Sequence, residues 1–320
     1  MRQMDKAAIR AALPWDRLIE ALAAMFREGC EAPLRHRHAW ADGAGAQNTL
    51  LLMPCFSKDF FATKLVSVFP AAPEYEQPVV NGVLVLADNR SGKPLAIMDG
   101  AAVTAQRTGA VGGLGVDRLT PENIETAGIL GAGVQGLSQA RYLLFNRRIK
   151  KLWINDLSLA SADKMAGILK RLFPDVTYVT TDNSEDLVKA SQLIIAATTS
   201  HTPLFEDDPS LVKGKTFISI GSFRPDMKEF PDAVISTADH VYVDTLFAAK
   251  ESGDICIPLE NKVVKPEKVQ AFSDLIAKPI DLENKTLFFK SVGMALFDLT
   301  VASAVYERAI KGKMGQVLDF

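Results

Sequence analysis

Residues 126–136 read Thr126-Ala127-Gly128-Ile129-Leu130-Gly131-Ala132-Gly133-Val134-Gln135-Gly136. The first five residues are a short apolar run that predicts a buried strand, and a helix is expected over 134–145. Three glycines with the spacing GxGxxG join the two. The first permits a tight turn, the second lets a ligand approach the backbone, and the third allows the helix to pack closely on the strand.

A glycine turn at the start of a helix is suited to binding phosphate groups. The free N–H groups and the positive end of the helix face the anion. The spacing alone is weak evidence, and a turn that only reverses the chain is the alternative reading, but a strand before it and a helix after it are the context in which it binds a dinucleotide. We therefore predict a dinucleotide site at Gly131, Ala132, Gly133, Val134, Gln135 and Gly136.

The next strand, expected over 151–155, indicates which dinucleotide is bound. It ends at Asn155-Asp156, and Asp156 lies 20 residues after Gly136. A carboxylate at this place accepts hydrogen bonds from the adenosine ribose and repels a 2′-phosphate. The following Leu157 and Ser158 supply no arginine for such a phosphate. The sequence favours NAD and leaves NADP possible.

Strands and helices continue to alternate on the C-terminal side of this turn. A helix is expected over 160–173, and further strands over 176–180, 193–197, 216–220 and 241–243. Such alternation is typical of a parallel sheet with helices on both faces. We predict an α/β fold in which residues 119–291 form a Rossmann-type, doubly wound dinucleotide-binding domain.

The N-terminal side of the turn has a different pattern. A helix is expected over 5–28, with a break at Leu13-Pro14, and one over 101–114. Between them the pattern predicts strands over 50–56, 64–69, 79–87 and 95–98. The polar connector at 120–123 marks the boundary. A last helix over 292–310 is expected to return, so residues 1–118 with 292–320 form an α+β domain.

Composition excludes several classes of protein. Of 320 residues 48% are hydrophobic, and 36 Lys and Arg balance 38 Asp and Glu, for a formal net charge of −2. This argues against nucleic acid and against a polybasic membrane contact. The three cysteines, Cys30, Cys55 and Cys256, have no CxxC spacing and suit buried thiols in a reducing cytoplasm. The pair His36 and His38 has no nearby carboxylate or cysteine cluster, so no metal site is predicted.

Three cations of the N-terminal half lie in apolar surroundings. They are Arg35 in Pro33-Leu34-Arg35, Lys64 in Ala62-Thr63-Lys64-Leu65-Val66, and Arg107 in a helix of small residues. A buried cation is costly unless an anion pairs with it. The pattern alone fits a structural ion pair or a contact to an anionic ligand.

The sequence as a whole resembles the ornithine cyclodeaminase/μ-crystallin family. Short motifs carry the resemblance in the same order along nearly the whole chain. They are Leu52-Met53-Pro54, residues 64–70 and 92–100, Arg107-Thr108-Gly109-Ala110, the turn at 131–135, Thr198-Thr199-Ser200, residues 221–229, Ser252-Gly253-Asp254 and Lys290-Ser291-Val292-Gly293.

The resemblance implies a homodimer in which the α+β domain binds substrate and makes the dimer contact. It also implies that Arg35, Lys64 and Arg107 grip the carboxylate of an α-amino or α-imino acid, with Arg37 as an alternative to Arg35. Lys64 and Arg107 become the candidate catalytic residues. Other candidates for the substrate site are Met53, Thr108, Phe223 and Gly293. Further candidates for the cofactor site are Thr108, Asn155, Asp156, Thr198, Thr199, Ser200, Gly221, Ser222 and Ser291.

One loop departs from the ornithine-cyclising members of the family. Their loop reads Gly-Gly-Asp-x-Pro-Gly-Lys-x-Glu, and its Asp engages the side-chain amine of ornithine. Here Phe223 stands at that Asp position, and a phenyl ring cannot balance an ammonium charge; Asp226 is the residue that could compensate. We therefore expect NAD(P)H-dependent reduction of an imino acid, or the reverse oxidation. Ornithine or lysine cyclodeamination, an opine-type synthase and a non-catalytic binding protein remain the alternatives.

Two further groups of polar residues are expected to be structural. His201 follows the Thr198-Thr199-Ser200 turn and is expected to satisfy a loop carbonyl. The basic residues Arg147, Arg148, Lys150 and Lys151 are expected to lie in solvent beside the second strand of the dinucleotide domain.

Overall fold

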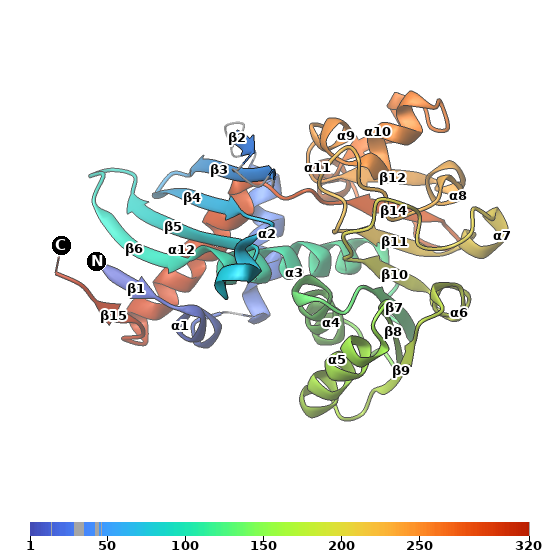
Figure 1. The fold of residues 1–320 in the computed structure, drawn as a ribbon, viewed down its shortest axis with the longest axis horizontal. Helices are drawn as coiled ribbons and strands as arrows, with labels where there is room; N and C mark the ends of the chain where they lie inside the picture. The colour runs from blue at the N-terminus through green and yellow to red at the C-terminus, as the bar shows by residue number, and fades with distance from the viewer. Residues whose placement is uncertain (14, 29–34, 42–44, 46, 320) are drawn as a thin grey trace. The chain divides into compact units, whose positions relative to one another are not determined.

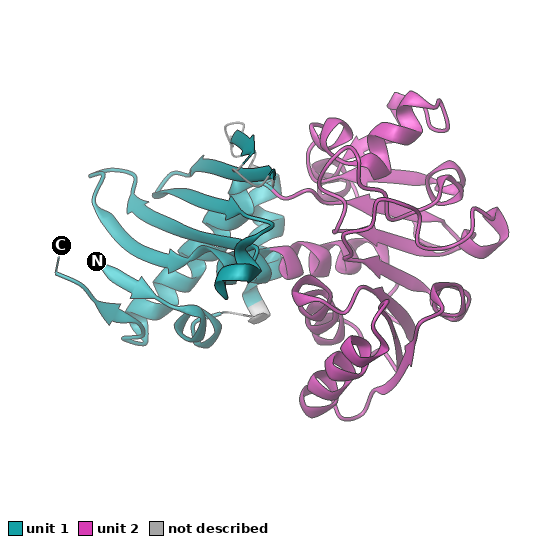
Figure 2. Cartoon of the chain, viewed as in Figure 1, with its two compact units in different colours: residues 1–107, 294–320 teal, residues 108–293 magenta. Residues whose placement is uncertain are grey.

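The computed structural model describes residues 1–13, 15–28, 35–41, 45 and 47–319. Contacts between residues divide the chain into two units, Met1–Arg107 with Met294–Phe320, and Thr108–Gly293 (Figure 2). The division falls inside helix α3 (Gly100–Leu119), not at the connector at 120–123, because the second half of α3 bonds to unit 2. The Thr108 carbonyl accepts a hydrogen bond from Gln139, and the Leu119 carbonyl accepts one from Thr216.

Unit 2 is built on a parallel sheet of eight strands. Their order in space is β13-β12-β14-β11-β10-β7-β8-β9, and all neighbours run parallel. Five of them, β9-β8-β7-β10-β11, have the strand order of a dinucleotide-binding sheet. The chain adds strands outward from β7 on one side, to β9, and then on the other side, from β10 to β11. This confirms the predicted Rossmann-type sheet. The bounds are β7 Thr126–Leu130, β8 Lys151–Asn155, β9 Thr177–Thr181, β10 Leu193–Ala196, β11 Thr216–Ser219, β12 His240–Val243, β13 Val269–Ala271 and β14 Leu287–Lys290.

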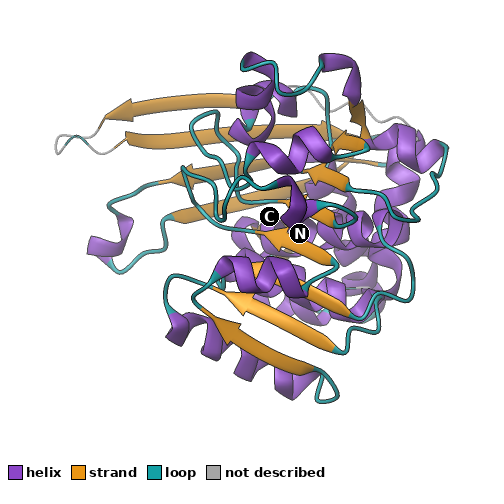
Figure 3. Cartoon of the chain, turned by 90° about the vertical axis from the view of Figure 1, so that its right-hand side faces the viewer, coloured by secondary structure: helices purple, strands orange, loops and turns teal. Residues whose placement is uncertain are grey.

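Helices cover both faces of this sheet (Figures 1 and 3). The first two, α4 (Val134–Asn146) and α5 (Leu159–Leu172), lie on one face, and α6 (Ser184–Ala190), α7 (Pro209–Val212) and α8 (Asp232–Thr237) lie on the other. Phe217, Phe230 and Phe288 meet edge to face in the core of this second layer. The remaining helical segments are α9 Ala248–Glu251, α10 Gly253–Glu260, η2 Pro266–Lys268 and α11 Phe272–Ala277.

Unit 1 contains a sheet of order β15-β1-β6-β5-β4-β3-β2. Its neighbours run antiparallel except β1 and β6. Helix α12 (Ala295–Lys311) packs on β3, β4 and β5 and against α2 (Trp15–Glu28) (Figure 1). The other bounds are β1 Arg2–Met4, α1 Lys6–Ala11, β2 His36–Ala41, β3 Gln47–Phe56, β4 Phe60–Val68, η1 Ala72–Tyr75, β5 Val80–Asp88, β6 Pro94–Asp99 and β15 Gln316–Val317.

Helix α3 is longer than the predicted segment 101–114. Its glycines do not end the helix, because they are there to allow close packing against neighbouring side chains. A Cβ on Gly112 would lie 1.7 Å from the Gln139 amide oxygen, and one on Gly115 would lie 2.7 Å from the Phe289 ring. Helix α12 begins at Ala295, later than predicted, because the Val292 and Gly293 N–H groups bond to a buried carboxylate. Within the described part of the chain, no helix has the length and apolar character needed to cross a membrane.

The end of α3 corrects the prediction of a solvent-exposed basic patch. Arg147 is 9% exposed, whereas Arg148 is exposed as predicted. The Arg147 guanidinium donates to the carbonyls of Val116, Asp117 and Thr120, and its Nε donates to the Thr120 hydroxyl. A helix leaves its last carbonyls without hydrogen-bond donors from its own backbone, and the Arg147 guanidinium donates to the carbonyls at the end of α3.

Candidate functional site

In unit 1, Lys64 lies in a row of buried apolar residues that crosses the sheet. On β4 it pairs with Met53 on β3 and with Leu84 on β5, and Leu84 pairs with Met98 on β6. These four side chains are between 0% and 5% exposed. Because paired residues of an antiparallel sheet point to the same face, the ammonium group lies on an apolar face that α12 covers.

An ion pair accounts for the burial of Lys64. Its Nζ lies 2.7 Å from Asp298 Oδ1, and both side chains are almost fully buried. A second contact of 3.0 Å joins Nζ to the Thr104 hydroxyl, which itself donates to the Gly100 carbonyl. Arg107 Nε approaches the same Asp298 oxygen at 3.4 Å. From the sequence, these cations could take part either in a structural ion pair or in a contact with an anionic ligand. The structure contains the ion pair.

The cluster carries an excess of positive charge. Burial lowers the pKa of Lys64 to about 8; Asp298 raises this pKa, whereas Arg107 and Arg35 lower it. Arg107 Nε and Asp298 Oδ2 have no hydrogen-bond partner among the described residues. Lys64 and Arg107 are thus two cations beside the single carboxylate of Asp298. A buried excess of this kind is suited to binding an anion.

Asp298 is the residue of this cluster that the sequence analysis did not select. It lies 234 residues from Lys64 along the chain, so no local pattern links the two. The available signal was a carboxylate inside the apolar stretch 292–305, which a buried helix tolerates only when the charge is paired.

The predicted dinucleotide turn of unit 2 has the geometry that its glycines require. Gly131 has a φ of +99°, and its N–H donates to the Asn155 carbonyl at 2.8 Å. A Cβ on Gly136 would lie 1.8 Å from the Gly131 carbonyl oxygen, whereas a Cβ on Gly133 would meet nothing within 4 Å. Gly133 caps α4 without a side-chain hydrogen bond. The helix start is therefore open, and the turn fits a pyrophosphate.

Asp156 follows β8 and reaches the same turn. Its Oδ2 accepts the Ala132 N–H at 2.7 Å, and its Oδ1 accepts the Ser158 N–H at 2.9 Å. Leu157 beside it is fully exposed and brings no cation. Asn155, at the end of β8, donates its side-chain amide to the Thr181 carbonyl at 3.1 Å. A negative charge at the turn disfavours a 2′-phosphate.

The loops after β10 and β11 hold further candidates for the cofactor site, and Glu229 joins them. Glu229 Oε1 accepts the N–H and the hydroxyl of Thr198, at 2.6 and 2.9 Å. Its Oε2 accepts the N–H groups of Gly221 and Ser222 at 2.8 and 3.0 Å. Gly221 cannot carry a Cβ, which would lie 2.0 Å from the Thr198 carbonyl oxygen. Thr199 is exposed.

The loop after β14 is held by a second buried carboxylate, Asp244. Its Oδ2 accepts the Ser291 hydroxyl at 2.8 Å and the N–H groups of Val292 and Gly293 at 3.0 and 2.8 Å. Gly293 has a φ of +84°, which suits glycine. Burial raises the pKa of the Asp244 carboxyl, which these donors oppose. The Ser291 hydroxyl thus donates its hydrogen to Asp244 and can only accept a hydrogen bond from a ligand.

The loop that carries Phe223 also contains Asp226, the residue that could compensate for the missing Asp. Asp226 is bound by Arg224 through Nε at 3.0 Å and a terminal nitrogen at 2.6 Å. Its own backbone carbonyl lies 2.8 Å from His201 Nδ1, so His201 meets a loop carbonyl as predicted. Phe223 is 39% exposed. With its carboxylate neutralised by Arg224, Asp226 does not present a free charge in place of the missing Asp.

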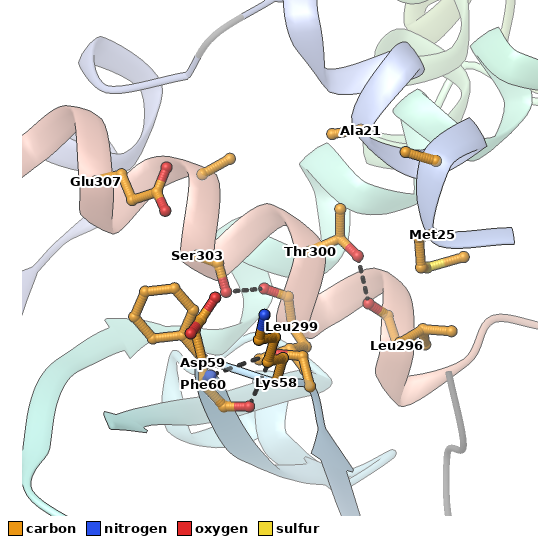
Figure 4. A pocket seen from close by; sticks show the side chains of 13 residues that line it. Ala21, Met25, Lys58, Asp59, Phe60, Leu296, Leu299, Thr300, Ser303 and Glu307 are labelled. Carbon is orange, nitrogen blue, oxygen red and sulfur yellow. Dashed lines mark hydrogen bonds between the residues drawn. The ribbon is translucent and has the colours of Figure 1, made fainter. Parts of the chain in front are cut away.

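A cavity of about 470 Å³ in unit 1 is lined by α2, the turn between β3 and β4, and α12 (Figure 4). None of Lys64, Arg107 and Asp298 lines it. Its hydroxyls Thr300 and Ser303 bond to carbonyls of their own helix. In the described part of the chain, no group of three or more His, Cys, Asp or Glu could hold a metal ion.

The strand order, the open glycine turn and the acidic residue after β8 define a protein of the Rossmann type. The chain belongs to the ornithine cyclodeaminase/mu-crystallin family, whose model matches residues 8–313. It is 32% identical to a Delta(1)-pyrroline-2-carboxylate reductase of Bacillus cereus over 284 residues, which is 87% of this chain and 86% of that protein. It is likewise 32% identical to the ketimine reductase mu-crystallin of Mus musculus over 265 residues, 82% of this chain and 81% of that one.

A solved structure agrees with these relatives. It is the Delta(1)-pyrroline-2-carboxylate reductase of Thermococcus litoralis in complex with NADH and L-proline, with a TM-score of 0.90 and 26% identity. The match covers 99% of this chain and 100% of that one.

Proposed function

We propose that this protein uses NADH to reduce an α-imino acid, of the ketimine type, to the amino acid, or catalyses the reverse oxidation. The observation that carries the proposal is the buried cluster of Lys64, Arg107 and Asp298, in which cations exceed carboxylates. The family relatives named above reduce imines of this class, and one of them binds NADH together with an amino acid.

The cations of unit 1 would hold the substrate carboxylate. Arg107 offers a planar guanidinium that can bind a carboxylate through two hydrogen bonds, and Lys64 offers a compact charge. Arg35, just before β2, is close enough to lower the pKa of Lys64 and would add to the same field. Met53, beside Lys64 on the sheet, would pack against the substrate side chain.

Lys64 would also supply the proton that imine reduction needs. The reduction adds a hydride to the imine carbon and a proton to the nitrogen, and bound NADH would supply the hydride from C4 of its nicotinamide. With a pKa near 8, the Lys64 ammonium can release its proton near neutral pH, directly or through a water molecule. Asp298 would keep enough of the ammonium form available by opposing the effect of burial.

Three groups of unit 2 residues would bind the dinucleotide. The turn from Gly131 to Gly136 would take the pyrophosphate, and Asp156 the adenosine ribose. The strand-end loops would take the nicotinamide half, through Thr198, Thr199, Ser200, Gly221, Ser222 and Ser291, together with Thr108 of α3. NAD is favoured over NADP because Asp156 is acidic and Leu157 offers no cation.

Ornithine cyclisation is less favoured. Phe223 has no carboxylate to balance the charge of a side-chain ammonium, and Asp226 is already paired with Arg224. Phe223 and Gly293 would instead limit the substrate side chain, which favours a cyclic or apolar imino acid.

We propose further that two copies of the chain associate through the open face of the unit 1 sheet, the face opposite α12. Register places Leu52, Leu65 and Val83 in one row of that face. Pro54, Thr63, Val85 and Ile97 form the next row. Leu65 and Val85 are 39% and 36% exposed, and an apolar patch of this kind marks a protein contact.

A cytoplasmic location suits the cysteines. Cys55 and Cys256 are both buried thiols, which suits a reducing compartment, and Cys30 lies outside the described residues.

The test is an assay of NADH and NADPH oxidation with a panel of cyclic imines, such as pyrroline- and piperideine-2-carboxylate, and keto acid–amine pairs. The proposal expects turnover of cyclic imines with NADH preferred. Dinucleotide binding with no turnover of any imine would favour a binding protein. Ammonia release from ornithine with catalytic NAD would favour a cyclodeaminase, and turnover of keto acid–amine pairs alone an opine-type synthase.

A further inference from the structure

Two carboxylates of unit 2 share one hydroxyl in the core beneath the strand-end loops. Ser219 Oγ, at the end of β11, lies 3.1 Å from Glu229 Oε2 and 2.6 Å from Asp254 Oδ2. It also accepts a hydrogen bond of 2.9 Å from Lys290 Nζ. All four residues are between 0% and 3% exposed, so water does not mediate these contacts.

The number of hydrogen atoms decides the protonation of this cluster. A serine hydroxyl has one hydrogen and can donate it to only one of the two carboxylates. The other contact to Ser219 needs a hydrogen of its own, so one of the two carboxyls must be protonated. The charges require the same proton, because two buried carboxylates beside one ammonium would leave an uncompensated negative charge. Asp244 also faces Lys290, but its donors are a hydroxyl and backbone N–H groups.

The distribution of donors shows which carboxyl holds the proton. Apart from Ser219, Glu229 receives four donors: the Thr198 N–H and hydroxyl and the Gly221 and Ser222 N–H groups. Burial raises the pKa of the Glu229 carboxyl, and the donors aimed at both of its oxygens oppose this by stabilising the ionised form. Asp254 uses Oδ1 to accept the N–H groups of Glu229 and Phe230, which leaves Oδ2 facing Ser219 alone.

We propose that Glu229 and Asp254 are positioning residues for the loops after β10 and β11, with a single proton held on Asp254 Oδ2 and donated to Ser219. Glu229 then accepts the Ser219 hydrogen, and its two oxygens fix Thr198, Gly221 and Ser222 before any ligand binds. This inference rests on the proposed function, in which these loops take the nicotinamide half of the dinucleotide. Loops fixed in advance lose less freedom on binding, which strengthens affinity.

A matched pair of amide substitutions tests the arrangement. Asp254→Asn places an N–H where the proposed proton lies, so hydrogen exchange of the backbone over 197–202 and 220–224 should stay within about threefold of wild type. Glu229→Gln places an N–H against backbone donors, so exchange there should rise about tenfold or more. Equal loosening in both variants, or in neither, would overturn the proposal.

Steady-state kinetics test whether the order of these loops affects the binding of NADH. Glu229→Gln should raise KM for NADH about tenfold, with a smaller effect on kcat at saturating NADH. Glu283→Gln, an exposed carboxyl of the same unit, is the control and should leave KM unchanged. Loosened loops in Glu229→Gln with KM for NADH as in wild type would overturn the positioning role.

Infrared spectroscopy keeps the proposal testable if Glu229→Gln does not fold. The wild-type protein at neutral pH should show the C=O stretch of a buried protonated carboxyl, and Asp254→Asn should lose it. Absence of that band from wild type, or its persistence in Asp254→Asn, would contradict the proton assignment. Exchange and infrared measurements use neither cofactor nor substrate, so they stand even if no imine is reduced.

Discussion

At the scale of single residues, the Asp298 carboxylate affects the charge of Lys64. Burial pushes the pKa of Lys64 down to about 8, and the adjacent Asp298 carboxylate works against that shift. Lys64 is therefore cationic at pH 7 and loses its proton as the pH rises through about 8. If its ammonium form binds the substrate carboxylate, kcat/KM for the imine should fall over the same range.

Asp298→Asn tests this coupling. Removal of the carboxylate removes the group that raises the Lys64 pKa, so the falling limb of kcat/KM against pH should move down by about one unit. Stability should also fall by about 3 kcal/mol, since a buried cation loses its partner. The measurements are pH–rate profiles and denaturant unfolding, with Asp59→Asn, an exposed residue of unit 1, as control. A limb that stays in place or moves to higher pH would contradict the role of Asp298.

At the scale of elements, the turn between β7 and α4 contains one glycine that is needed for packing, Gly136, and one that is expected to contact the dinucleotide, Gly133. Gly136→Ala forces a Cβ to 1.8 Å from the Gly131 carbonyl oxygen and should lower the melting temperature. Gly133→Ala has open space and an ordinary φ, so it should fold as wild type yet bind NADH about tenfold more weakly. Thermal unfolding and NADH titration make the comparison, and Gly167→Ala in α5 is the control. Unchanged NADH affinity in Gly133→Ala would place the pyrophosphate elsewhere.

The end of α3 gives a prediction about stability alone. Arg147→Met removes the donor to the carbonyls of Asp117 and Thr120, whereas the Val116 carbonyl keeps the N–H and the hydroxyl of Thr120. The free energy of unfolding should fall by about 3 kcal/mol, whereas the exposed neighbour Arg148→Met should change it by less than about 0.5 kcal/mol. Denaturant titrations of the two variants measure the difference. Similar values for both would mean that Arg147 is not needed as a cap.

Some helices and strands of this protein can be predicted from the sequence, and others cannot. Six strands of unit 2, β7 to β12, are short runs bounded by glycine, proline or polar residues, and the sequence pattern locates them, whereas β13 and β14 are not predicted. Strands β1 and β15 are too short for periodicity and form through their pairing with each other and the pairing of β1 with β6. The core cluster of Ser219, Glu229, Asp254 and Lys290 joins segments far apart in the chain, so their roles could not be read locally.

At the scale of the whole molecule, the open face of the unit 1 sheet predicts the state of association. Wild type should have the mass of a dimer, and Leu65→Glu combined with Val85→Glu should shift it to a monomer, because two charges would enter an apolar contact. Light scattering after size exclusion measures the mass, and Lys93→Glu on an exposed turn is the control. A monomeric wild type, or a variant that stays dimeric, would show that this face is not the contact.

Hydride transfer between a dinucleotide and an imino acid is the central claim, and isotope transfer tests it most directly. The protein is given NADH that carries deuterium at the transferred C4 position, together with pyrroline-2-carboxylate, and the amino acid product is analysed by mass spectrometry and NMR. The account predicts one deuterium at the α-carbon of proline, and strong loss of this product in Arg107→Met. Proline formed without deuterium at that carbon, or no consumption of NADH with any imine, would contradict the account.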